Sequence, residues 1–376
     1  MATVNNKIQQ IETELQALFL EMNGPIRGLL CAILSRQHVL LIGPPGTGKS
    51  LLARTLCEAI TGAKFFQWLL TKFTTPEEIF GSLSLKALEE GKYQRITANK
   101  LPEAHVAFTD EVFNANSSIL NTLNTIINEG LFFNDSVPTK VPLITMIGAT
   151  NLIPEDSNLQ AFYDRFLLRY IVQYIVEDGN FLKMLQTTNY KLKTSISLKE
   201  IEEMQKEVEK IDVPDNIWQL LVNIRHKLQE KSIIIGNRRF KHALSIIKAN
   251  AYLNGHQSVT PEDLSILKDI LWSDPKEIGE IERIVLSISN PFERITLDLQ
   301  EEFDSIFANI PQNPTEVEKM QLGAEILAKL KILAEKTNNT IKEAKNQGYN
   351  ITNIQKFQQL IKDKQQMILE EYLGVA

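Results

Sequence analysis

The chain has 376 residues, of which 43% are hydrophobic and 23% are charged. This length allows two or three domains, and the composition is that of an ordinary globular protein. The formal net charge of −6 disfavours nucleic acid and acidic lipid as general partners. The two cysteines exclude a disulfide framework. Because the chain has neither a basic-then-apolar leader nor an apolar run of about 18 residues, we expect a cytoplasmic protein without a membrane span.

Residues 1–190 predict an α/β domain. Helical periodicity covers residues 6–36, and short apolar runs then recur between helical or loop segments. These runs lie at residues 38–42, 64–69, 105–109, 143–149 and 166–174. Strands that alternate with helices predict a parallel sheet, and its buried strands should be apolar throughout, as VLLI and VAF are.

The rest of the chain predicts helices only. Residues 191–278 contain four helical segments, the last of which follows Thr260, a good N-cap before Pro261. We expect these segments to form a separate helical domain. Residues 279–376 are helical and charged, and their length suits a three-helix bundle or hairpin arm.

The segment after the first apolar run fits a phosphate-binding loop. Gly43, Pro44, Pro45, Gly46, Thr47, Gly48, Lys49 and Ser50 match G-x-x-x-x-G-K-[ST] without deviation, and Leu51 continues into the expected helix. Glycines let successive backbone N–H groups face a phosphate, and the helix start adds its positive dipole end. Lys49 would reach the β- and γ-phosphates of ATP, and Ser50 would bind Mg²⁺.

Two further apolar runs end in polar residues with suitable chemistry. The run HVAFTDEVF places Asp110 and Glu111 at the end of a strand, on the same sheet edge as the phosphate loop. Asp110 would hold Mg²⁺, and Glu111 would orient and deprotonate the attacking water. The run LITMIGATN ends in Asn151, which would contact that water or the γ-phosphate. A base that activates water favours hydrolysis over transfer to a metabolite.

These motifs in this order resemble an AAA+ ATPase of the MoxR family, and within it the RavA subfamily. The likeness extends over residues 5–275 and includes phrases such as FFQWLLTKFTTPEEIFGSL, ILNTLNTIINEGLFFN, GATNLIPEDSNLQAFYDRFLLRY and IGNRRFKHALSII. It implies an AAA+ αβα core followed by a helical lid. It also implies ATP and Mg²⁺ as ligands, a ring oligomer such as a hexamer, and a chaperone-like role. A protein with a von Willebrand factor A domain is the implied partner, beside an unknown client protein.

The resemblance assigns two arginine positions. Arg165, in FYDRF, is the expected arginine finger that reaches the γ-phosphate of the neighbouring subunit, with Arg169 as the alternative. An ordinary salt bridge from Arg165 to Asp164 or Glu155 is the competing interpretation.

Arg238, in GNRRF, is the expected sensor-2 arginine of the lid, acting on the nucleotide of its own chain. The adjacent Arg239 is its alternative, because on a helix the two side chains point about 100° apart and only one should reach the site.

Residues 73–102 are too long for a simple crossover and resemble the insert of this family that faces the pore of the ring. Phe132 and Phe133 lie in the segment that resembles the hairpin before Asn151, where either client contact or core packing would explain them. Because about 100 residues follow the lid, we expect the small inserted domain of larger family members to be absent.

Two other functions remain open from the sequence. The first is an ATPase motor stimulated by nucleic acid, which the acidic composition disfavours. The second is a scaffold whose assembly is gated by nucleotide and in which turnover is incidental.

Overall fold

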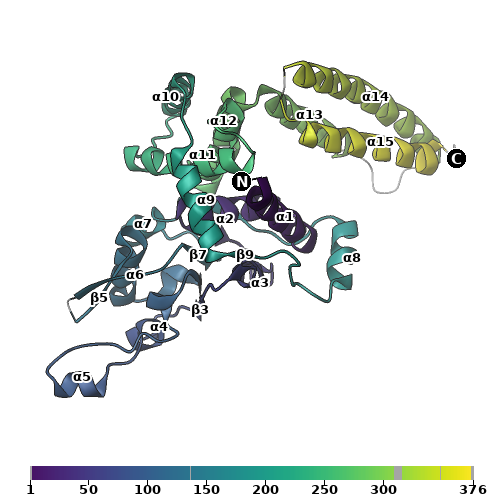
Figure 1. Cartoon of the computed structure of the whole chain (residues 1–376). Helices are drawn as coiled ribbons and strands as arrows, with labels where there is room; N and C mark the ends of the chain where they lie inside the picture. Colours follow the sequence, from purple (N-terminus) through teal and green to yellow (C-terminus); the bar gives the residue numbers. More distant parts are fainter. Residues whose placement is uncertain (1, 136, 309–315, 348, 374–376) are drawn as a thin grey trace. The chain divides into compact units, whose positions relative to one another are not determined.

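The computed structural model describes residues 2–135, 137–308, 316–347 and 349–373. The chain forms two compact units (Figure 1). The first contains the residues up to Gln219 together with Ile233–Ile278, and the second contains Leu220–Ser232 and the residues from Gly279 onward. The first unit thus joins the predicted core to most of the predicted lid. The domain boundaries at residues 190 and 278 remain a prediction.

The first unit is built on a five-stranded parallel sheet in the order β3-β4-β7-β1-β8. Its strands are β1 (Val39–Ile42), β3 (Phe65–Leu69), β4 (Val106–Asp110), β7 (Thr145–Thr150) and β8 (Leu168–Ile171). All residues of β1 and β7 are buried, as expected for central parallel strands covered on both faces. The predicted α/β class and its parallel sheet are confirmed.

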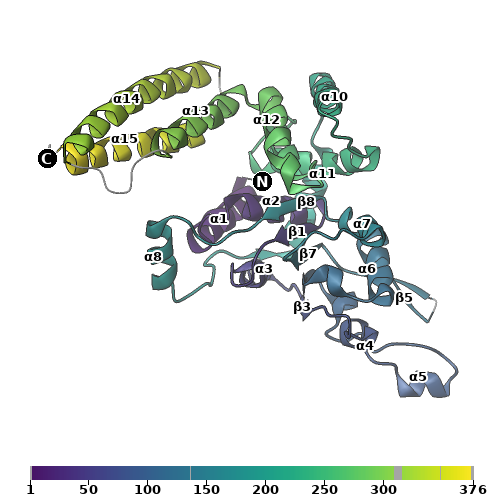
Figure 2. The ribbon, with the colours of Figure 1, turned by 180° about the vertical axis from the view of Figure 1, so that it is seen from behind.

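Helices and smaller elements surround this sheet (Figures 1 and 2). The helices are α1 (Ala2–Leu18), α2 (Asn23–Ser35), α3 (Lys49–Glu58), α4 (Pro76–Phe80), α5 (Leu85–Glu89), α6 (Ser117–Glu129), α7 (Ser157–Tyr163) and α8 (Asp178–Gln186), with 3₁₀ turns η1 (Leu101–Glu103) and η2 (Val112–Asn114). The short strands are β2 (Ile60–Thr61) paired with β9 (Ile196–Ser197), and the hairpin β5 (Leu131–Asn134) and β6 (Val137–Lys140). In both views α5 lies at the tip of an excursion that leaves the sheet.

The predicted lid, residues 191–278, contains α9 (Leu198–Lys210), α10 (Asp215–Glu230) and α11 (Asn237–Leu253), followed by η3 (Pro261–Asp269) and η4 (Pro275–Glu277). Thr260 and Asp263 form a capping box at the predicted helix start, but the turns that follow are 3₁₀ and not α-helical. Arg27 of α2 ties α11 to the core, because its guanidinium bonds Asn250 and Asn254 and also pairs with Glu12 of α1. Helix α11 therefore has a fixed place beside the sheet.

The second unit contains α12 (Ile278–Ser289), α13 (Pro291–Phe307), α14 (Glu316–Asn346) and α15 (Thr352–Leu373). Helices α13, α14 and α15 lie side by side (Figures 1 and 2) and share an apolar core that includes Leu299, Leu330 and Ile361. The predicted helical C-terminal region is confirmed. Within the described residues, no helix combines the length and apolarity needed to cross a membrane.

Candidate nucleotide-binding site

The phosphate loop connects the carboxyl end of β1 to α3, and local packing requires its first glycine. The Gly43 N–H donates to the Thr150 carbonyl at 2.9 Å. A Cβ at Gly43 would lie 1.9 Å from the Val172 carbonyl oxygen, so only glycine fits between these two segments. Gly46 and Gly48 have φ of +81° and +82°, a conformation that favours glycine.

Lys49 lies inside this loop. Its ammonium donates to the carbonyls of Gly43 and Pro44 at 2.8 and 2.7 Å, and to the Thr47 hydroxyl at 3.2 Å. Burial lowers the Lys49 pKa, while Asp110 and Glu111 act in the opposite direction and favour the charged form. In the described part of the chain, no backbone hydrogen bond uses the N–H groups of Gly46, Thr47 or Gly48. The loop therefore offers a buried cation and unused donors to an anion.

The carboxylates follow β4 at the same edge of the sheet. Glu111 has a left-handed backbone with φ of 51°, and its N–H donates to the Asp110 carboxylate at 3.1 Å. Asn151, just after β7, donates its amide to Glu111 Oε1 at 2.8 Å, and Asn114 donates to Oε2 at 3.3 Å. Burial raises the Glu111 pKa, and the neighbouring Asp110 charge raises it further. A carboxylate held in this way has the properties of a general base.

These residues fit ATP with Mg²⁺. The loop donors and Lys49 suit the phosphates, and the Ser50 hydroxyl and Asp110 carboxylate are hard oxygen ligands of the kind Mg²⁺ takes together with phosphate oxygens. Bound ATP and Mg²⁺ would supply the reactive γ-phosphate and the neutralising charge. Among the described residues there is no protein-only cluster of three or more His, Cys, Asp and Glu side chains for a metal.

A second cluster of charge lies at the amino edge of the sheet, the edge where β1 and β8 begin. Arg165 and Arg238 line a pocket of about 450 Å³ there, together with His38, Asn128 and His242. Arg238 donates to Asn128 Oδ1 at 3.2 Å, whereas Arg165 Nε is buried and has no hydrogen-bond partner in the described structure. Burial and the neighbouring Arg238 charge lower the Arg165 pKa.

The two alternative arginines are part of the core. Arg169, on β8, is fully buried, donates to the carbonyls of Phe166, Trp272 and Tyr163, and stacks on the Tyr163 ring. Arg239 donates to the Ile270 and Trp272 carbonyls. Both also pair with Asp164. These two guanidinium groups are already fully engaged within their own chain.

Comparison with known proteins places the chain in a family. A model of the MoxR domain in MoxR-vWA-beta-propeller ternary systems matches residues 6–212, more than half of the chain, and a model of an AAA lid domain matches residues 216–285. The chain is a MoxR-family AAA+ ATPase. It therefore binds nucleotide and hydrolyses ATP.

Two uncharacterized proteins of Methanocaldococcus jannaschii are similar to this MoxR-family chain over most of their length. One is 42% identical over 303 residues, which cover 80% of this chain and 79% of the relative. The other is 39% identical over 350 residues, which cover 91% of this chain and 92% of the relative. The crystal structure of a Cytophaga hutchinsonii protein assigned as an ATPase matches with a TM-score of 0.63 over 76% of this chain and 94% of that one. At 19% identity this last likeness shows the fold alone.

Within this MoxR-family fold, the predicted site residues separate into two groups. One group lies at or just after the carboxyl ends of β1, β4 and β7, and contains Lys49, Ser50, Asp110, Glu111 and Asn151. Arg165 and Arg238 lie at the amino edge beside His38. At about 3.3 Å per residue, the five steps from His38 to Gly43 span roughly 16 Å. Arg238 at the start of α11 thus lies at the edge opposite to the phosphate loop of its own chain, and its action on that chain's nucleotide stays a prediction.

The insert and the hairpin are joined by side chains that the sequence did not single out. Asn134 accepts a hydrogen bond from the Arg95 N–H at 2.7 Å and donates to the Arg95 carbonyl at 3.2 Å, and Asp135 accepts from the Tyr93 N–H at 2.9 Å. Core packing and client contact were the two alternatives for Phe132 and Phe133, and the two side chains differ in their burial. Phe132 is buried and stacks on Phe80, whereas Phe133 is 52% exposed.

Sequence reasoning also missed Asn114 and Asn128, which contact Glu111 and Arg238. Asn114 stands three residues after Glu111, so a search for amides near the expected base would have found it. Asn128 carries no such signal. Its proximity to Arg238 depends on how α6 and α11 pack, with 110 residues between them in the sequence.

Proposed function

We propose that this MoxR-family protein hydrolyses ATP between the subunits of a ring, and that it uses the hydrolysis to remodel or assemble a partner protein. Each nucleotide would lie between the carboxyl edge of one subunit and the amino edge of the next. Closed rings of identical subunits form when such a head-to-tail contact repeats with a suitable rotation. A hexamer is the ring size that the family resemblance implies.

The main observation behind this proposal is the placement of Arg165 and Arg238. Both guanidinium groups lie at the amino edge, too far from the phosphate loop of their own chain. The buried Arg165 Nε has no partner among the described residues, which costs stability unless a function compensates for it. A neighbouring triphosphate would supply the missing acceptor. We therefore assign both Arg165 and Arg238 a role in trans.

The carboxyl edge would supply the other half of each site. Lys49 and the loop N–H groups hold the phosphates, and Ser50 and Asp110 hold Mg²⁺. Glu111 takes a proton from the attacking water. Asn151 positions Glu111 through their 2.8 Å hydrogen bond and contacts the γ-phosphate or the water. Arg165 stabilises the charge that develops in the transition state.

The partner is inferred from the family and from the exposed surface. The matching domain model is named for systems that contain a vWA protein, which supports a von Willebrand factor A domain protein as the partner. Exposed apolar side chains at Phe133, Val137, Leu85 and Tyr93 on the hairpin and insert would contact an unfolded or extended client. The narrower likeness to the RavA subfamily remains a prediction.

Subunit mixing tests the trans arrangement. Arg165→Ala should reduce ATP hydrolysis by about 10³-fold or more. Glu111→Gln should be inactive for a different reason, because its sites lack the base. In a mixture, the sites that combine an intact Glu111 with a neighbour's intact Arg165 should regain activity.

Arg225→Ala, at an exposed position of α10, is the matched control and should hydrolyse ATP at the unmodified rate. Absence of recovery in mixed samples that co-assemble would overturn the trans role. A hydrolysis rate per chain that does not vary with protein concentration, in a protein that stays monomeric with ATP and Mg²⁺, would overturn the ring.

A further inference from the structure

Helix α8 (Asp178–Gln186) carries an apolar face that no described residue of its own chain covers. None of its side chains is buried. Phe181, Leu182 and Leu185 are 46%, 57% and 62% exposed, which is unusual for three large apolar residues on one short helix. In Figures 1 and 2 the helix stands at the margin of the core.

These side chains form a single stripe with one charge at its end. Residues 178, 181, 182 and 185 have the i, i+3, i+4, i+7 spacing that places side chains on one helix face. Asp178 therefore lies at the amino end of the stripe. Lys183, the basic residue of α8, is about 140° away from Asp178 around the helix at 100° per residue. The exposed face is apolar and acidic.

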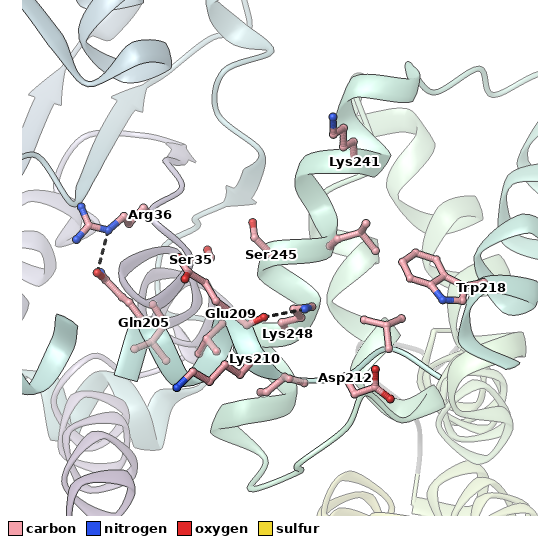
Figure 3. A pocket seen from close by; sticks show the side chains of 15 residues that line it. Ser35, Arg36, Gln205, Glu209, Lys210, Asp212, Trp218, Lys241, Ser245 and Lys248 are labelled. Carbon is pink, nitrogen blue, oxygen red and sulfur yellow. Dashed lines mark hydrogen bonds between the residues drawn. The ribbon is translucent and has the colours of Figure 1, made fainter. Parts of the chain in front are cut away.

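A groove of about 640 Å³ with matching chemistry lies on the first unit, between α2, α9, α11 and Trp218 in the first turn of α10 (Figure 3). Its apolar lining includes Leu34, Val208, Ile211, Val213 and Leu244, and Trp218 is 41% exposed. Lys210, Lys241 and Lys248 line it as well, against the acids Glu209 and Asp212. In Figure 3, Trp218 lies across from Gln205 and Arg36, and Lys241 and Lys210 lie toward opposite ends.

The helix and the groove belong to opposite edges of the sheet. Helix α8 follows the carboxyl end of β8, and Glu21 fixes its start by accepting hydrogen bonds from the Val176 and Glu177 N–H groups. The nearby Tyr174 hydroxyl donates to the Pro45 carbonyl of the phosphate loop at 3.2 Å. The groove begins at the carboxyl end of α2, just before β1, and shares Arg36 with the Arg165–Arg238 pocket. It is therefore continuous with the amino edge.

We infer that α8 of one copy docks into this groove of the next copy, with its apolar stripe against Leu244 and Trp218 and with Asp178 beside a lysine of the rim. The inference rests on the proposed ring and adds a contact that forms part of its interface. The same head-to-tail contact that brings Arg165 to a neighbour's phosphates brings the groove toward that neighbour's α8. The face exposed in one chain is then buried in every subunit of a closed ring.

Crosslinking tests the contact directly. Chains carrying Leu185→Cys are mixed with chains carrying Lys241→Cys or Lys210→Cys, in the presence of ATP and Mg²⁺, and treated with a short bismaleimide. The native Cys31 and Cys57 are buried and should not react. We expect covalent dimers with at least one of the two groove positions. Lys183→Cys on the opposite face of α8 is the matched control and should yield at least tenfold less dimer with either partner.

A second measurement tests the same contact without depending on the distance between two introduced cysteines. The double variant Leu182→Asp, Leu185→Asp should raise the protein concentration needed for half-maximal ATPase activity by at least tenfold. Lys183→Asp should leave that concentration unchanged within twofold.

The two proposals fail separately. If neither groove position crosslinks and the double variant assembles like the unmodified protein, while Arg165→Ala is still rescued by mixing, docking of α8 is excluded and the ring stands. If mixing rescues nothing and the protein stays monomeric, the ring itself is excluded, and the docking that depends on it with it.

Discussion

The two edges of the parallel sheet use their charged groups differently. At the carboxyl edge the groups satisfy one another: Lys49 is bonded to loop carbonyls, and Glu111 accepts from Asn151 and Asn114. At the amino edge Arg165 lacks a partner for its buried Nε among the described residues. The first edge is complete for binding nucleotide, while the second presents a buried Arg165 Nε that has no acceptor among the described residues.

The arginines of the amino edge differ among themselves in the same way. Arg169 and Arg239 are buried and bonded to carbonyls and to Asp164, so they hold β8 and α11 in place. Arg165 and Arg238 lie in a pocket that is open to a ligand. The hydrogen bonds of Arg169 and Arg239 indicate a structural role, whereas the unpartnered Nε of Arg165 supports the functional role proposed for it, and substitutions can test that separation.

The largest effect in a single chain is expected at the carboxyl edge. Glu111→Gln removes the base but keeps the shape and the hydrogen bond from Asn151, so hydrolysis should fall by about 10²–10⁴-fold. Fluorescent ATP binding should be unchanged within a few-fold, because the phosphates are held by the loop. Glu129→Gln, at an exposed site on α6, is the control. A variant with near-normal turnover would show that another group activates the water.

The next largest effect distinguishes the two arginines of the FYDRFLLRY segment. Arg169→Ala removes three buried hydrogen bonds and the pairing with Asp164, and should lower the free energy of unfolding by about 3–5 kcal/mol. Arg165→Ala removes an unpartnered donor and should change it by less than about 0.5 kcal/mol. Urea denaturation of the nucleotide-free proteins measures both. An equal loss in the free energy of unfolding for both variants would mean that Arg165 also stabilises the fold.

Much of this arrangement could be predicted from the sequence. Apolar runs that end in a glycine loop, in Asp110-Glu111 or in Asn151 are enough to place those side chains at one edge, because parallel strands share their direction. The choice between Arg165 and Arg169 could not be made. The chain leaves α7 at Tyr163 and enters β8 at Leu168, and that change of structure decides which arginine turns inward.

The cis or trans role of Arg238 depends on long-range packing for the same reason. Its helix contacts α2 and α6, and nothing local in GNRRF indicates which sheet edge it will meet.

The alternation of side chains along a strand explains why Phe132 and Phe133 differ in burial. Adjacent residues of β5 point to opposite faces, so one of Phe132 and Phe133 had to be buried and the other exposed, although the sequence did not say which.

An effect of intermediate size is expected from His38, which lies at the amino edge and is buried. Its Nδ1 accepts from the Met146 N–H, and Nε2 bonds the Ile127 carbonyl, both at 3.0 Å. Burial lowers the His38 pKa to about 4, so only the neutral ring fits. Between pH 6.5 and 4 the unfolded chain binds a proton that the folded chain does not, and stability falls as pH falls through this window.

At pH 5 this difference in proton binding costs about 2 kcal/mol relative to pH 7.5. His38→Gln should be less stable than the unmodified protein at pH 7.5 but should lose less on acidification, as measured by urea denaturation at both values. His226→Gln, at an exposed site, should retain the full pH dependence. The same pH dependence in His38→Gln would assign the effect to other groups.

The smallest effect is expected in the insert at residues 73–102, which runs from the carboxyl end of β3 to the amino end of β4. The insert there is held to the β5–β6 hairpin by Asn134, whose amide bonds both the N–H and the carbonyl of Arg95. Asn134→Ala removes both bonds from a partly exposed site and should destabilise this attachment by about 1 kcal/mol. Amide hydrogen exchange in residues 82–97 should rise about fivefold, with the exchange of β1 and β7 unchanged. Lys140→Ala on the same hairpin removes no hydrogen bond that the described residues make to the insert, and should change the exchange of neither the insert nor the sheet. Faster exchange throughout the sheet after Asn134→Ala would instead mean that the insert and both edges open as one cooperative unit.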